Sequence, residues 1–167
     1  MKFENRYYID KDMYKEFVYK VATKKITIGA LIILFIAIVS FFIFRDDSFE
    51  TTISIVVGII SIGMIILTPP LYLKQLLDLD NKLHNGQRPE AVVTFDDKIT
   101  LEEGKQKISI EYAQIKKYYR LKKCSVLMFS EQNGILFVED KFTIGTKEEF
   151  EKFILEKCNN LDKIITR

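Results

Sequence analysis

Two long apolar segments without charged residues constrain this fold more than any other feature of the sequence. Residues 26–44 contain no charged side chain, and 14 of these 19 residues are Ile, Leu, Val or Phe. As a helix this segment is about 28 Å long, close to the hydrocarbon thickness of a bilayer. The second segment, residues 51–73, reaches about 27 Å at Thr68, before the pair Pro69-Pro70 interrupts the backbone hydrogen bonds. We therefore expect two membrane-spanning helices.

A buried core helix and a cleaved signal peptide are the alternatives for these segments. Outside residues 26–73 the chain has 119 residues, too few to enclose two helices that are apolar on every side. The first apolar run begins after 25 residues, lacks an A-x-A-like cleavage site and is followed at once by the second run, so we expect both spans in the mature protein. Neither span contains Asp, Glu, Lys, Arg or His, which argues against a transporter or pump.

The distribution of charge around the spans predicts their orientation. Basic residues lie on the side of the two chain ends: Lys20, Lys24 and Lys25 before the first span, and Lys74, Lys82 and Arg88 after the second. The connection, residues 45–50, carries one positive and three negative charges. Because basic residues stay on the cytoplasmic side, we expect a two-span protein of the cell membrane with both termini in the cytoplasm.

Small residues recur along one face of each span. Ala30 and Ala37 are seven residues apart in the first span, and Ser54, Gly58 and Ser61 follow at spacings of four and three in the second. Since small residues allow two helix backbones to approach closely, we expect these five to form the contact within the hairpin. A homodimer interface is the alternative use of the same face.

The spans are flanked by two shorter regions. Residues 1–25 predict a strand at residues 3–9 and then a helix capped by Asp10. Residues 74–90 predict an amphipathic stalk helix that ends at Asn85-Gly86, followed by a linker. His84, the single histidine of the chain, lies on this stalk helix, where we expect it to be solvated.

Residues 91–167 predict a small α+β domain in the cytoplasm. Short apolar runs alternate with turn signals, which favours five or six antiparallel strands, and Asn133-Gly134 between two such runs is typical of a hairpin. Thr146 and Glu149 have the spacing of a capping box at the start of a terminal helix. The residues of that helix expected to face the sheet are Phe150, Phe153 and Ile154. The pattern indicates a sheet or pleckstrin-homology-like barrel closed by a C-terminal helix.

The order of these elements resembles the YcxB-like family of bacterial membrane proteins. The resemblance rests on an N-terminal strand and helix, the two-span hairpin, residues 108–115 (ISIEYAQI), a strand pair, Phe142, and a helix with Glu148, Phe150 and Leu155. It covers the whole chain and implies a pleckstrin-homology-like cytoplasmic domain. The family brings no assigned activity, and the sequence uses Phe and Tyr where tryptophan is expected in such domains.

The residues of catalytic or metal sites are scarce in this sequence. It lacks a phosphate-binding G-x-x-x-x-G-K-[ST] loop, G-x-G-x-x-G, H-E-x-x-H and G-x-S-x-G. Cys124 and Cys158 show no metal-ligand spacing, and we interpret them as small apolar residues that fill space. We therefore expect no catalytic residues, no metal ligands and no cofactor.

The densest cluster of charge is residues 116–123, where five of eight residues are basic. The alternation of a strand would place Lys116, Tyr118, Arg120 and Lys122 on one exposed face. Near the membrane this face could bind anionic lipid headgroups or a membrane protein partner, and a merely solvated strand face is the alternative. The net charge of +2 gives no reason to expect nucleic acid as a partner.

The sequence thus favours a non-catalytic, membrane-anchored interaction module whose cytoplasmic domain binds lipid or protein. An immunity protein that blocks a membrane-active toxin is the alternative, suggested by the small size and the two spans. A membrane enzyme is the third and least favoured hypothesis.

Overall fold

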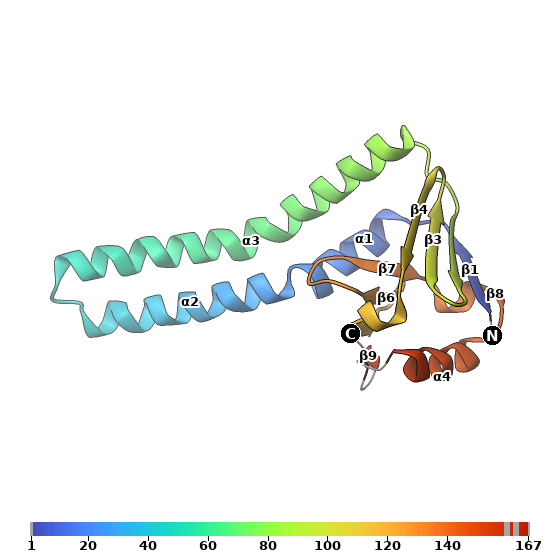
Figure 1. The fold of residues 1–167 in the computed structure, drawn as a ribbon. Coiled ribbons are helices and arrows are strands. Elements are labelled where there is room, and N and C mark those ends of the chain that lie inside the picture. The colour runs from blue at the N-terminus through green and yellow to red at the C-terminus, as the bar shows by residue number, and fades with distance from the viewer. Residues whose placement is uncertain (1, 159–160, 162–163, 167) are drawn as a thin grey trace.

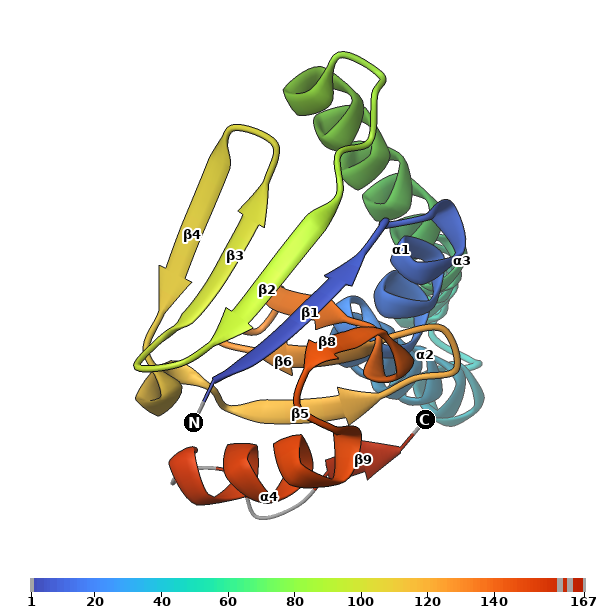
Figure 2. The same cartoon turned by 90° about the vertical axis from the view of Figure 1, so that its right-hand side faces the viewer.

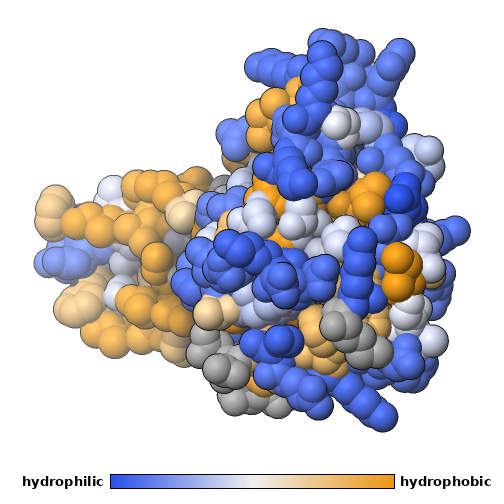
Figure 3. All heavy atoms as spheres, turned by 45° about the vertical axis from the view of Figure 1, so that its right-hand side comes forward, coloured by the Kyte–Doolittle hydropathy of each residue, from blue (hydrophilic) through white to orange (hydrophobic). Residues whose placement is uncertain are grey.

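A hairpin of two long helices projects from a body made of two sheets and shorter helices (Figure 1). The computed structural model describes residues 2–158, Leu161 and residues 164–166. The helices of the hairpin are α2 (Lys24–Ile43) and α3 (Ser48–His84). Both helices are long and apolar enough to cross a membrane. Only 11% of the most apolar stretch of each is buried, so neither is a core helix of the body. Figure 3 shows apolar side chains covering the hairpin and mainly polar ones covering the body.

The N-terminal helix begins where the sequence predicts. Helix α1 (Lys11–Phe17) starts after Asp10, whose side chain accepts a hydrogen bond of 2.7 Å from the backbone N–H of Met13. It passes through a π-helical turn, η1 (Val18–Ala22), directly to α2. The apolar hairpin is therefore joined to the body by nearly continuous helix.

Helix α3 continues through the proline pair that interrupts its backbone hydrogen bonds. It runs from Ser48 to His84 with Pro69 and Pro70 inside it, and it changes direction along its length (Figure 1). Each proline removes one backbone donor, which bends a helix without necessarily ending it. The second span and the predicted stalk are thus one helix, which ends as expected at Asn85 in the left-handed conformation.

The first sheet combines the N-terminal strand with strands that follow the apolar hairpin. Its strands, in spatial order, are β4 (Gln106–Ile110), β3 (Ile99–Glu103), β2 (Ala91–Phe95), β1 (Phe3–Tyr7) and β8 (Phe142–Ile144). All neighbours are antiparallel, and β1 lies between β2 and β8 (Figure 2). The predicted regions 1–25 and 91–167 therefore share one sheet, with the apolar hairpin inserted between β1 and β2.

The second sheet is mixed, which corrects the expectation of antiparallel strands throughout. Its order is β7 (Gly134–Phe137), β6 (Ser125–Met128), β5 (Lys117–Arg120) and β9 (Ile164–Thr166). The β6–β7 hairpin at Asn133-Gly134 is confirmed, whereas β9 runs parallel to β5. The described residues form two separate sheets and no closed barrel, so the α+β class is confirmed and the barrel is not.

The C-terminal helix packs against the sheets, as predicted. Helix α4 (Lys147–Lys157) starts with the capping box of Thr146 and Glu149 and lies along one side of the body (Figure 2). Its buried residues are Phe150, Phe153 and Ile154. Two short 3-10 helices, η2 (Tyr112–Gln114) and η3 (Glu139–Lys141), complete the body, and Cys124 and Cys158 are buried within it.

Candidate functional site

The predicted basic strand face does not form. Tyr118 and Tyr119 are neighbours in β5, yet both are buried, because the two faces of this strand are covered by different parts of the body. Tyr118 lies in the aromatic core, with its ring centroid 5.7 Å from that of Phe137. The expectation that Tyr118 lies on an exposed face is therefore wrong. The four residues predicted to share this face occupy three different environments. They are Lys116, Tyr118, Arg120 and Lys122.

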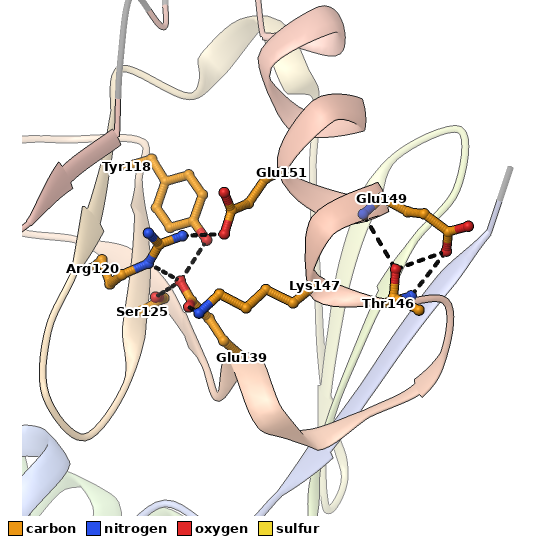
Figure 4. Close-up of polar contacts among 8 residues, drawn as sticks. All are labelled: Tyr118, Arg120, Ser125, Glu139, Thr146, Lys147, Glu149 and Glu151. Carbon is orange, nitrogen blue, oxygen red and sulfur yellow. Dashed lines mark hydrogen bonds and ion pairs between the residues drawn. The ribbon is translucent and has the colours of Figure 1, made fainter.

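Tyr118 and Arg120 belong to a polar network centred on Glu139 (Figure 4). One carboxylate oxygen, Oε1, accepts hydrogen bonds from Tyr118 Oη at 2.9 Å, Arg120 Nε at 2.7 Å and Ser125 Oγ at 2.7 Å. The other oxygen, Oε2, lies 2.6 Å from Lys147 Nζ. Arg120 also pairs with Glu151 on α4.

The positive and negative charges of this network balance each other. Burial opposes ionisation of Glu139, but hydrogen bonds from Lys147, Arg120, Ser125 and Tyr118 lower its pKa from 4.5 to about 2. Two cations face two carboxylates, so no charge is left for a ligand. We interpret the network as structural, because it fastens α4 and η3 to β5 and β6.

Lys122 lies in the turn between β5 and β6, which is held by α1. The backbone N–H groups of Lys122 and Lys123 donate to the two carboxylate oxygens of Glu16 at 3.0 and 2.7 Å. The side chains of both lysines are exposed. This turn therefore presents positive charge to solvent.

Lys116 lines a groove of about 280 Å³ between the start of α2 and the β5–β6 hairpin. Four lysines surround it, Lys24 and Lys25 from α2 and Lys116 and Lys117 from the β5 end. The apolar side chains that line it are Val21, Ile28, Tyr119 and Met128, and Ser130 and Glu131 complete the rim. The groove thus combines an apolar lining with a basic rim.

Glu131 balances part of this charge. Its carboxylate pairs with Lys25, and the hydrogen bond and the charge of Lys25, followed by the charges of Lys117 and Lys116, lower the pKa of Glu131. Within the described part of the chain, Lys24, Lys116 and Lys117 have exposed side chains and appear in no ion pair. Four lysines and one glutamate give the rim of the groove a net charge of +3.

The groove lies at the base of the apolar hairpin. Lys24 and Lys25 are the first two residues of α2, and the run without charge begins at Ile26, the next residue. The basic rim and the apolar helix therefore meet within one helical turn. The sequence contained both halves of this site, but only the fold brings residues 24–25 next to residues 116–117.

The small residues predicted to form the helix seam lie between α2 and α3. Ala30 and Ala37 are the buried residues of α2, and Ser54 and Ser61 are buried on α3. A Cβ atom at Gly58 would lie 3.9 Å from Leu34 Cδ1 of the facing helix. These residues therefore occupy the contact within one chain.

His84 is not solvated as the sequence suggested. Its side chain is only 7% exposed and lies against Asp80 of the same helix and Glu103 of β3. In the described ranges this is the one group of imidazole and carboxylate side chains close enough to share a metal ion. Sequence reasoning missed Glu103 because it is 19 residues from His84 and belongs to another element.

No family model matches the chain, and no curated protein or solved structure matches it either.

Proposed function

We propose that this protein is a non-catalytic, membrane-anchored module whose basic groove binds anionic phospholipid headgroups at the cytoplasmic surface. The observation that carries this proposal is the cluster of Lys24, Lys116 and Lys117 in the groove. These lysines have no ion-pair partner among the described residues. The cluster lies where the apolar helix α2 leaves the body. Headgroup phosphates lie at this depth when the apolar part of α2 occupies the hydrocarbon region.

The chemistry of the groove suits an amphipathic ligand. Lysines near an anionic surface each contribute about 1 kcal/mol, so three provide about 3 kcal/mol, which is too little for tight binding of a free headgroup. The apolar helices would hold the groove within reach of lipid permanently, which raises the effective concentration of the ligand. The apolar side chain of Ile28, on the membrane side of the rim, could contact the start of an acyl chain.

Lipid binding can be measured on the full chain in detergent. In native mass spectrometry, phosphatidylglycerol should bind more tightly than phosphatidylcholine. Replacing Lys24, Lys116 and Lys117 together by glutamine should weaken phosphatidylglycerol binding on the order of 100-fold, because about 3 kcal/mol of attraction is lost. Inorganic phosphate alone should not displace the lipid.

A charge-matched variant is the control for this experiment. Lys122, Lys141 and Lys152 are exposed lysines outside the groove, and replacing all three by glutamine removes the same charge. This variant should keep most of the lipid affinity. Equal losses in the two triple variants would contradict a specific groove and would favour a diffuse effect of net charge.

Both chain ends should lie in the cytoplasm if the groove faces the inner leaflet. A green fluorescent protein fused after Arg167 should fluoresce, and alkaline phosphatase at the same place should be inactive. Phosphatase inserted in the α2–α3 connection at Asp46 should be active. The reverse pattern would place the groove on the outer surface and would refute this orientation.

A further inference from the structure

Three side chains with metal-binding atoms meet where the end of α3 touches the sheet. Asp80 and His84 are four residues apart and share one face of α3, and Glu103 is the last residue of β3. His84 Nε2 lies 3.5 Å from Glu103 Oε1 and 3.8 Å from Asp80 Oδ1. All three ligand atoms lie within 4.8 Å of one another.

These separations are long for hydrogen bonds but suit a shared ion. A hydrogen bond between nitrogen and oxygen has a length of about 2.7 to 3.2 Å. Two ligand atoms that are each about 2.1 Å from a tetrahedral ion are about 3.4 Å apart. The imidazole therefore lies near both carboxylates at the spacing of coordinating atoms.

The polar atoms of the cluster are buried and incompletely satisfied. The side chains of Asp80, His84 and Glu103 are 5%, 7% and 14% exposed. Asp80 Oδ2 is buried without a hydrogen bond in the described structure, and its neighbouring cation is Arg88, with Nε at 3.5 Å. Tyr14 Oη donates to Asp80 Oδ1 over 3.4 Å. A buried carboxylate with contacts this long is costly unless a further partner binds it.

The charge of the cluster favours a cation. Two carboxylates and the guanidinium of Arg88 leave one negative charge when His84 is neutral. A divalent cation would more than offset this negative charge.

We propose that Asp80, His84 and Glu103 bind one Zn²⁺ ion. One imidazole nitrogen with carboxylate oxygens suits zinc, whereas Mg²⁺ and Ca²⁺ prefer sets made only of oxygen. A cleft of about 540 Å³, lined by His84, Arg88 and Gly104 among others, borders the cluster on the side of His84. The ion links α3 to β3, so its binding fixes how the apolar hairpin meets the sheet.

Zinc binding can be tested with the full chain in detergent, independently of lipid. After dialysis against micromolar zinc, elemental analysis should give one ion per chain, and excess Mg²⁺ should not displace it. His84→Gln and Asp80→Asn should each lower zinc affinity by at least about tenfold, since even the loss of groups that only support a ligand costs that much. Glu102→Gln, which changes the exposed neighbour of Glu103, should bind zinc as the unaltered protein does.

Two further measurements keep the proposal falsifiable if a substituted chain folds poorly. Zinc should raise the Tm of the unaltered protein. Cobalt should give the intense visible absorption of a four-coordinate site. An unaltered protein that retains no zinc, or variants of His84 and Asp80 that retain it undiminished, would overturn the proposal.

Discussion

Replacing Phe150 by alanine should lower the free energy of unfolding by about 3 to 5 kcal/mol, because the substitution empties the centre of the core. Phe150 is fully buried. Its ring centroid lies 5.6 Å from Phe3, 4.5 Å from Phe95, 5.3 Å from Phe137 and 4.8 Å from Phe142. These four rings belong to β1, β2, β7 and β8, so one side chain of α4 joins strands of both sheets.

A second residue of α4 provides the control. Leu155 is 38% exposed, and its replacement by alanine should cost less than about 1 kcal/mol. The chain has eight tyrosines and no tryptophan, so urea unfolding in detergent can be followed by near-ultraviolet circular dichroism of the tyrosines. Similar losses for Phe150→Ala and Leu155→Ala would contradict the central position of Phe150. Because small domains have total stabilities of about 5 to 15 kcal/mol, the predicted loss is a large fraction of the whole.

Replacing Glu139 by glutamine should cost about 1 to 3 kcal/mol, the size expected for the loss of hydrogen bonds to a charged group. The substitution removes the carboxylate charge that Arg120 and Lys147 share. The side chains of these two cations are 27% and 35% exposed, so solvent compensates part of the loss. Asp140→Asn is the matched control, since Asp140 is the exposed neighbour in the same short helix. The control should unfold at nearly the same urea concentration as the unaltered protein.

The same network predicts how stability depends on pH. The pKa of Glu139 is lowered from 4.5 to about 2 in the folded protein, so the unfolded chain binds the proton first as the pH falls. The stabilisation is therefore complete above about pH 5 and is lost between about pH 5 and pH 2. Tm measured across this window should fall in the unaltered protein and less steeply in Glu139→Gln. Parallel curves for the two proteins would show that Glu139 does not titrate as described.

Some features of the structure follow from local sequence signals. The helix starts at Asp10 and Thr146, the helix end at Asn85 and the hairpin at Asn133-Gly134 all form as predicted. Each depends on interactions between residues a few positions apart, which do not change when the rest of the chain folds around them. Pro69 and Pro70 each remove a backbone donor, and α3 nevertheless continues past them to His84.

The positions of the candidate site residues could not be read from the sequence. Alternation predicts an exposed Tyr118 only if one face of the strand is solvated, and β5 is covered on both faces. The basic groove needs α2 beside β5, although 73 residues, 44–116, separate the two elements in the chain. Glu139 and its donors likewise come from η3, β5, β6 and α4.

The sequence by itself determined the two apolar helices, their antiparallel connection, the caps and the α+β character of the remainder, since hydrophobic periodicity and capping act over a few residues. Only the tertiary structure decided that β1 lies inside the sheet formed with β2 and β8, that the sheets stay open, and that Asp80, His84 and Glu103 meet. These features depend on which distant surfaces bury each other. That choice is made by the packing of the whole chain. The local pattern is compatible with other pairings, and the observed one surrounds Phe150 with four aromatic rings.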